Sequence, residues 1–270
     1  MGILNVTPDS FSDGGLHLDP EAALAHARRM AEAGADHIDV GGESTRPGAD
    51  PVPAAEEIRR VLPVIERLKR EIPLPVSIDT VKHEVAAAAL AAGADLVNDI
   101  GGMRLDPEMA ETVAEGGAGV ILGHIRGTPA TMQDDPRYAD PVREVIAELG
   151  GSVRRAREAG IPADRILIDP GIGFGKRAQD NLALLARLDR FRELGCPIVI
   201  GVSRKSFLGR ILDLPAGERL EGTLAAEAIA VMHGADILRT HEVAATVRAA
   251  RVADALRRAR DTAPAPVRES

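Results

Sequence analysis

Polar and charged residues stand at the ends of short apolar runs along the whole chain. Eight runs are mostly Ile, Leu and Val, and they cover residues 3–4, 38–40, 76–78, 96–97, 120–122, 166–168, 198–200 and 237–238. The residues that end or follow these runs include Asn5, Glu43, Asp79, Asn98, Asp99, His124, Asp169, Lys205, Arg239 and His241. If the runs are parallel strands of one barrel, their polar ends lie at a single mouth, where barrels of this kind carry out chemistry.

The segments after the first two runs are the longest and the richest in glycine. They cover residues 5–15 and 41–48. Both mix glycine with hydroxyl groups and charge, a composition that suits lids closing over a substrate as well as ordinary surface loops. Backbone amides with Ser44, Thr45 and Arg46 suit a phosphate group. Asn5 and Asp9 suit a magnesium ion that keeps water and substrate oxygens as ligands.

Asp79, Asn98 and Asp169 bring carboxylate and amide groups to the same mouth. Their oxygens accept hydrogen bonds, and the Asn amide also donates. Such a set can read the edge of a flat, nitrogen-rich heterocycle. A carboxylate pair for glycoside chemistry, from Asp79 and Asp169, is a weaker alternative.

Cations gather after the last two runs. Lys205 lies beside Arg204, and Arg239 precedes His241 by two residues. Anionic groups bind in this quarter of such barrels, although an ordinary surface charge cluster has the same composition. A Schiff-base role for Lys205 is disfavoured, because the flanking serines do not supply the apolar pocket that a neutral amine prefers.

Other polar residues are interpreted as structural. Asp36, Asp95 and Asp236 each follow a Gly-Ala pair before an apolar run, which is the wrong end for catalysis. Cys196 is expected to be a buried, inert thiol, and the sequence has neither paired cysteines nor a His-x-x-x-His pattern for zinc. The histidines expected at the surface or at junctions are His17, His26, His37, His83 and His233.

Helical spacing of apolar residues separates the runs. It predicts helices over residues 19–33, 53–71, 82–92, 107–116, 139–159, 178–194, 217–233 and 242–260. Alternating helices and strands favour parallel βα units. The predicted fold class is therefore α/β, a single-domain (β/α)8 TIM barrel over residues 1–260, with long loops after strands 1 and 2 and a flexible tail at 261–270.

Composition limits the possible partners. The chain has 270 residues, is 45% hydrophobic and carries a formal net charge of −8. This balance predicts no nucleic-acid partner and no membrane-surface partner. The sequence shows no signal-peptide pattern and no apolar run long enough to cross a bilayer, so a cytoplasmic protein is expected.

At these loops the sequence resembles the dihydropteroate synthase family, and the resemblance covers residues 2–248. The two long motifs are very specific, and the shorter ones follow in the family's order. The motifs are Met-Gly-Ile-Leu-Asn-Val-Thr-Pro-Asp-Ser-Phe-Ser-Asp-Gly-Gly (1–15), Asp-Val-Gly-Gly-Glu-Ser-Thr-Arg-Pro-Gly (39–48), Ser-Ile-Asp-Thr (77–80), Asn-Asp-Ile (98–100), Asp-Pro-Gly-Ile-Gly-Phe-Gly-Lys (169–176) and Ser-Arg-Lys-Ser (203–206).

The resemblance implies a reaction and its partners. The family joins 4-aminobenzoate to 6-hydroxymethyl-7,8-dihydropterin diphosphate, which gives 7,8-dihydropteroate and pyrophosphate in folate biosynthesis. It implies Mg²⁺ as cofactor, small-molecule substrates and a homodimer formed through the last helices. A non-catalytic pterin-binding protein or a folate-dependent methyl-transfer relative is the alternative, since such proteins share the barrel and the pocket carboxylates.

The resemblance also implies residue roles. Asp169 and Asn98 are expected to read the amino-pyrimidine edge of the pterin, and Lys205 its carbonyl side. The expected catalytic residues are Asp79, Asp169, Lys205 and Arg239, and the metal ligand is Asn5. The diphosphate is expected to meet Thr45, Arg46, Arg239 and His241, and the aminobenzoate to meet Phe11, Pro47, Phe174 and Ser206.

Few positions depart from the family pattern. Gly123 stands where the family commonly has Met, which removes an apolar contact expected under the pterin. Thr240 and Glu242 replace a more usual Val and Asp, which are mild changes. None of these departures removes a residue with an expected catalytic role.

Overall fold

The computed structural model describes residues 1–7, 20–44 and 51–262, and the strands in these ranges pair in parallel. β7 (Val199–Ile200) pairs with β8 (Ile237–Leu238). The other strands form one sheet in the order of the chain: β1 (Gly2–Asn5), β2 (Ile38–Gly41), β3 (Val76–Asp79), β4 (Leu96–Asp99), β5 (Gly119–Gly123) and β6 (Ile166–Asp169).

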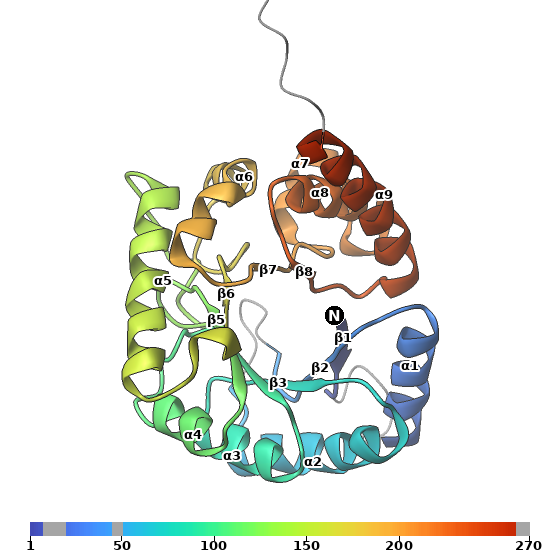
Figure 1. Cartoon of the computed structure of the whole chain (residues 1–270), viewed down its shortest axis with the longest axis vertical. Helices are drawn as coiled ribbons and strands as arrows, with labels where there is room; N and C mark the ends of the chain where they lie inside the picture. Colours follow the sequence, from blue (N-terminus) through green and yellow to red (C-terminus); the bar gives the residue numbers. More distant parts are fainter. Residues whose placement is uncertain (8–19, 45–50, 263–270) are drawn as a thin grey trace, which may run out of the picture.

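Single parallel bridges join the two sheets at both edges. Ile168 of β6 bridges Ile198 beside β7, and Gly2 of β1 bridges Thr240 beside β8. At the second edge the Ile3 amide donates to the Thr240 carbonyl at 3.0 Å. The strands therefore follow one another around a ring, with the helices outside it (Figure 1). This arrangement confirms the predicted TIM-barrel class.

Helices alternate with these strands in the described part of the chain. Short 3-10 turns accompany them at η1 (Ala163–Arg165), η2 (Leu188–Leu194) and η3 (Ala216–Glu218). The α-helices are α1 (Pro20–Glu32), α2 (Ala54–Glu71), α3 (His83–Ala91), α4 (Met109–Glu115), α5 (Pro141–Glu158), α6 (Ala178–Ala186), α7 (Ser206–Leu212), α8 (Leu220–Met232) and α9 (Val243–Thr262). None of these helices is long and apolar enough to cross a membrane.

Alternation along each strand separates two apolar regions. Val76 and Ile78 of β3 belong to the main core, which the helices cover. Ser77 and Asp79 therefore face the interior of the ring. A second cluster joins Met1, Ile121, Val199, Leu96, Leu167 and Ile237. These residues come from β4 to β8 and from the residue before β1, so the interior of the ring is where they meet. They form an apolar plug below the polar mouth.

The structure corrects two helix predictions. The helix predicted over 178–194 ends at Ala186, and η2 continues as a 3-10 turn. The tighter turn aligns Leu188 with Phe191, three residues on, and both are fully buried. Helix α7 was not predicted, because it has only seven residues with Gly209 in the middle.

The C-terminal boundary of the barrel is also slightly displaced from its predicted position. Helix α9 continues to Thr262, two residues beyond the predicted boundary at 260. The remainder of the predicted tail, 263–270, lies outside the described residues. The segments between β1 and α1 and between β2 and α2 are long, as expected.

Candidate active site

Arg239 joins two carboxylates at the mouth of the barrel. Its Nε donates to Asp39 Oδ2 at 2.6 Å, and its Nη2 donates to Asp79 Oδ2 at 2.6 Å. The Asp39 side chain is fully buried, whereas 18% of the Arg239 side chain remains exposed. These residues come from β2, the end of β3 and the segment after β8, so the closed ring is what brings them together.

Burial dominates the electrostatics of this group. It raises the pKa of Asp79 to about 7, although the positive charge of Arg239 opposes the shift. Burial also disfavours the charged form of Arg239, but Asp39 and Asp79 outweigh this effect and raise the pKa of Arg239. The mouth thus holds a carboxyl group that titrates near neutral pH beside a permanently charged guanidinium.

Asp39 also organises the floor of the mouth. Ser77 Oγ donates to Asp39 Oδ1, and Asn98 Nδ2 donates to Asp39 Oδ2 at 3.1 Å. Asn98 is only 4% exposed. Its carboxamide is therefore oriented by a buried partner, which fixes the direction of a group with both donor and acceptor capacity.

The loop after β6 brings three predicted residues together. Asp169 Oδ1 accepts a hydrogen bond from the Gly171 amide at 2.7 Å. Lys205 Nζ donates to the Ile172 carbonyl and lies 4.4 Å from the centre of the Phe174 ring. Burial raises the pKa of Asp169, although the positive charge of Lys205 opposes this shift. Burial also lowers the pKa of Lys205 to about 8. This side of the mouth pairs an acceptor with a donor.

His241 and Ser206 lie on the same side of the molecule as Lys205. The His241 ring places Nδ1 3.0 Å from Ser203 Oγ, and its backbone amide donates to the same oxygen. Arg204 forms an ion pair with Glu242. Ser206 is exposed at the first residue of α7. Imidazole and cations are therefore available where β7 and β8 end.

Asn5 faces Asp79 across a glycine. A Cβ at Gly41 would lie 3.7 Å from Asn5 Oδ1 and 3.8 Å from Asp79 Oδ2, so the absence of a side chain keeps the space between them open. Asn5 makes no side-chain hydrogen bond to another described residue. An amide oxygen beside a carboxylate fits a magnesium ion that takes its other ligands from water and substrate.

Five residues with predicted roles lie outside the described residues: Asp9, Phe11, Thr45, Arg46 and Pro47. The described ends of the second loop are nevertheless anchored. The Val52 amide donates to Glu43 Oε1 at 2.7 Å, and Lys82 Nζ donates to Glu43 Oε2 at 2.7 Å.

A separate group of ligand-type atoms belongs to the surface and caps a helix. His83, Glu84 and Asp106 bring nitrogen and carboxylate oxygens close together. Asp106 Oδ2 accepts from the His83 backbone amide at 2.8 Å and lies 2.9 Å from the His83 ring nitrogen. This carboxylate satisfies the first turn of α3, which accounts for the arrangement.

Comparison with known proteins identifies the family. The family described as "Pterin binding enzyme" matches residues 1–241. A dihydropteroate synthase from Synechocystis sp. is 48% identical over 257 residues, which cover 95% of this chain and 89% of that protein. A solved dihydropteroate synthase from Xanthomonas albilineans with 4-aminobenzoic acid is 49% identical, with a TM-score of 0.89 over 97% of this chain and 93% of that one. The chain belongs to the dihydropteroate synthase family.

A further structure extends the likeness to a product complex. The Xanthomonas albilineans enzyme in complex with 7,8-dihydropteroate has a TM-score of 0.86 and 46% identity, and the match covers 97% of this chain and 93% of that one. The chain described here is accordingly a transferase of folate biosynthesis. The chain is thus similar to dihydropteroate synthases in both sequence and barrel structure.

Sequence reasoning missed two buried charged residues. Asp39 lies inside an apolar run and has no predicted role. It precedes Gly41, the last residue of β2, by two residues and therefore lies on the same face of the strand. Lys176 ends the 169–176 motif without a predicted role, but it is 3% exposed. Its rarity was a signal, since the chain has few lysines.

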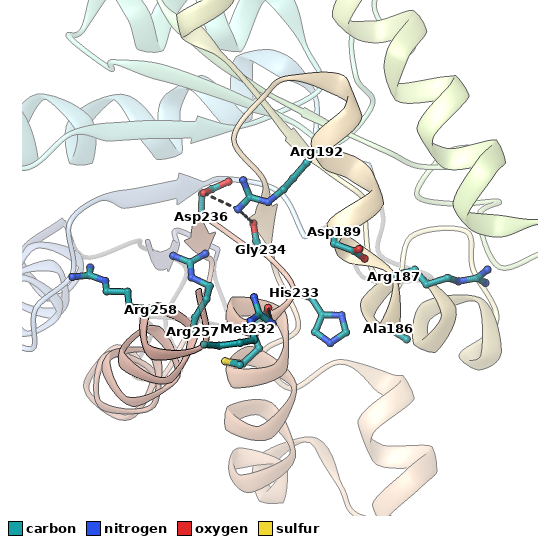
Figure 2. A pocket seen from close by; sticks show the side chains of 11 residues that line it. Ala186, Arg187, Asp189, Arg192, Met232, His233, Gly234, Asp236, Arg257 and Arg258 are labelled. Carbon is teal, nitrogen blue, oxygen red and sulfur yellow. Dashed lines mark hydrogen bonds and ion pairs between the residues drawn. The ribbon is translucent and has the colours of Figure 1, made fainter. Parts of the chain in front are cut away.

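A hollow of about 830 Å³ at the opposite end of the barrel is not the site. Figure 2 shows Arg192 directed toward Asp236 and the Gly234 carbonyl. Arg192 donates to Gly234 O at 3.1 Å, and Arg260 donates to Met232 O at 3.3 Å. These arginines neutralise the carbonyl end of α8. The described site residues do not line this hollow.

Proposed function

We propose that the barrel mouth joins 4-aminobenzoate to the methylene carbon of 6-hydroxymethyl-7,8-dihydropterin diphosphate. The single observation that carries the proposal is the convergence of Asp79, Asn98, Asp169, Lys205 and Arg239 at one end of the ring. This group combines acceptors for amino groups, donors for a carbonyl and a fixed positive charge. A flat pterin ring needs the first two, and its diphosphate needs the third.

Each side of the mouth has a distinct binding task. Asp169 and Asn98 accept and donate hydrogen bonds along the amino-pyrimidine edge, and Lys205 donates to the carbonyl side. Arg239 covers the ring face and meets the diphosphate together with His241. The pKa of Lys205 near 8 keeps it mostly protonated at neutral pH, which this donor role requires.

The reaction needs no protein nucleophile. The carbon–oxygen bond to the diphosphate breaks, and its electron pair leaves with pyrophosphate. The amine nitrogen of 4-aminobenzoate then bonds to the methylene carbon and loses a proton. The Asp79 carboxylate stabilises positive charge on the pterin as this bond breaks, and Arg239 stabilises the negative charge that develops on the leaving group. The closed site holds the two reactants in line.

Departure of the diphosphate would be helped by a magnesium ion. Asn5 would hold the ion through its side-chain oxygen, with the Asp79 carboxylate nearby. When bound, the ion neutralises negative charge on the diphosphate oxygens. The remaining binding residues of the proposal, Thr45, Arg46, Phe11, Pro47, Phe174 and Ser206, contact the diphosphate or the aminobenzoate.

The dimer proposed from the resemblance has an apolar surface available. Ile229 on α8 is 51% exposed, and Val252 and Leu256 on α9 are 62% and 59% exposed. These two helices pack on each other and lie next to each other in Figure 1. We propose that this surface, the α8–α9 patch of Ile229, Val252 and Leu256, contacts a second copy of the chain.

Pyrophosphate release tests the activity. Purified protein with magnesium should release pyrophosphate only when both substrates are present. Lys205→Ala and Asp169→Asn should each lower kcat/KM at least about tenfold, equivalent to about 1.4 kcal/mol, because each removes a contact to the pterin.

Lys69→Ala is the matched control, because Lys69 pairs with Asp95 at the opposite end of the barrel. Equal losses in the control and in Lys205→Ala would contradict the assignment of Lys205. Pterin binding without release of pyrophosphate would instead support the non-catalytic alternative.

A further inference from the structure

Lys176 is a buried lysine at the end of the loop that follows β6. Its Nζ lies 2.9 Å from His124 Nδ1 and donates to the carbonyls of Gly171 and Phe174, each at 2.9 Å. The His124 carbonyl is a fourth acceptor at 3.2 Å. The residue is 3% exposed, so these contacts replace water almost completely. None of the roles proposed above uses it.

A neutral imidazole connects Lys176 to a carboxylate on α5. An ammonium group only donates, so His124 Nδ1 accepts and its Nε2 carries the proton. Nε2 lies 3.0 Å from Glu148 Oε2. Burial, together with the charge of Lys176, lowers the pKa of His124 to about 4, which keeps the ring neutral. The hydrogen bond from His124, with Arg126 beside it, lowers the pKa of Glu148 to about 2.

Burial lowers the pKa of Lys176 as well. Four acceptor atoms nevertheless lie within 3.2 Å of its nitrogen, although the Gly171 carbonyl also accepts from the Phe174 amide at 3.0 Å. The ammonium form supplies three donors, whereas a neutral amine supplies two. The chain Lys176–His124–Glu148 therefore places a positive charge, a neutral ring and a negative charge in line.

The hydrogen-bonded series Lys176–His124–Glu148 holds the loop that carries the proposed pterin contacts. Lys176 Nζ holds the carbonyls of Gly171 and Phe174. In the same loop the Gly171 amide donates to Asp169, and the Ile172 carbonyl accepts from Lys205. The buried Lys176 thus orients the backbone groups of residues 171–174 that contact Asp169 and Lys205.

The backbone of the loop packs closely against the loop after β5. A Cβ on Gly171 would lie 1.8 Å from the His124 carbonyl oxygen, and a Cβ on Gly175 would lie 2.5 Å from the Arg126 carbonyl oxygen. The loops after β5 and β6 therefore touch backbone to backbone. Loss of the Lys176 contacts would disturb the geometry at Asp169 directly.

We infer that Lys176, oriented by His124, is a positioning residue for pterin binding. It sets the direction of the Asp169 and Lys205 side chains through the backbone of residues 171–174. The inference rests on the proposed function only in that the mouth binds a pterin. It does not depend on the transfer of the methylene group.

Pterin affinity without chemistry is the decisive measurement. Calorimetry with 6-hydroxymethylpterin, which lacks the diphosphate, reports the contacts to the pterin ring, those of Asp169 and Lys205 among them. Lys176→Met should weaken binding at least about tenfold, because the loop carbonyls lose their common donor. Lys69→Met, at the opposite end of the barrel, should stay within about twofold of the wild type.

Two substitutions of His124 separate positioning from packing. In His124→Asn the side-chain oxygen takes the place of Nδ1 and can still accept from Lys176. In His124→Gln the amide takes the place of Nε2 and can still donate to Glu148. His124→Asn should keep affinity within about threefold of the wild type, and His124→Gln should lose at least about tenfold.

Several outcomes would overturn the inference. One is a folded Lys176→Met protein that binds the pterin as tightly as the wild type. Another is an equal loss for His124→Asn and His124→Gln that follows their unfolding midpoints in urea. If Lys176→Met does not fold, the two His124 variants decide the question.

Pterin binding and pyrophosphate release by the wild-type protein distinguish failure of this inference from failure of the proposed function. A wild-type protein that does not bind the pterin overturns both. A wild-type protein that binds it but releases no pyrophosphate overturns only the proposed activity.

Discussion

At the scale of single residues, the mouth is defined by two groups that titrate close together. The pKa of Asp79 is raised to about 7 and that of Lys205 is lowered to about 8, in both cases chiefly by burial. The proposed reaction needs Asp79 as a carboxylate and Lys205 as an ammonium. Both forms coexist only in a narrow range around neutral pH.

The pH dependence of the reaction should therefore be bell-shaped. Below about pH 7 Asp79 gains a proton, and above about pH 8 Lys205 loses one, so kcat/KM for the pterin diphosphate should fall on both sides. Steady-state rates with saturating 4-aminobenzoate measure this profile. Lys205→Arg should remove the alkaline limb, because arginine stays protonated. An unchanged alkaline limb in this variant would assign it to another group.

The sequence predicted which residues lie at the mouth better than it predicted how they interact. Asp79, Asn98, Asp169 and Arg239 each end or follow an apolar run, and parallel strands place such residues together. Asp39 could not be assigned in this way, since its inward direction depends on strand register and ring closure. Its contacts to Ser77, Asn98 and Arg239 join strands that are far apart in the sequence.

At the scale of elements, the contact between the loops after β5 and β6 is the tightest feature near the site. Gly171 has φ of +68° and lies against the His124 carbonyl. Its conformation and the lack of a side chain are both required there. Gly160, which follows α5, also has a positive φ of +96°, but a Cβ would meet nothing within 4 Å.

The two glycines form a matched pair for measuring this contact. Gly160→Ala should cost about 1 kcal/mol of unfolding free energy from backbone strain alone. Gly171→Ala should cost at least about 3 kcal/mol, because steric overlap adds to the same strain. Urea denaturation of both variants measures the difference. Equal costs would mean that the loops separate easily.

Helices and strands were predicted correctly where the pattern of apolar residues extends over most of the element. The strands matched the apolar runs, since both faces of these strands are buried. Helix α7 and turn η2 were not predicted. The first has seven residues and a central glycine. In the second, burial of Leu188 and Phe191 replaces the α-helical spacing by a 3-10 one.

At the scale of the whole molecule, the exposed apolar residues of α8 and α9 stand out on a chain with a net charge of −8. A charged surface keeps copies of a protein apart, so an apolar patch on it indicates a contact surface. Helices α8 and α9, which carry the patch, lie on the outside of the barrel (Figure 1).

Charge placed on this patch should separate the two copies. Val252→Glu combined with Leu256→Glu should raise the dimer dissociation constant at least about a hundredfold, because carboxylates would be buried without partners. Sedimentation velocity measures the change. Leu105→Glu, an exposed leucine outside the patch, should leave the mass unchanged. A monomeric wild-type protein at micromolar concentration would rule out the proposed dimer.

The way the ring closes has a consequence for the width of the pocket. Asp79, Asn98 and Asp169 stand on the six-stranded arc, whereas Lys205 and Arg239 follow the two short strands. One bridge joins the arcs at each seam, whereas β7 and β8 pair at two positions, so the two seams set the distance between the acidic and basic walls. Arg239, which follows β8, binds Asp39 of β2 and Asp79 of β3 and so connects the two arcs. A ligand that draws this guanidinium away would loosen the wall against which it binds.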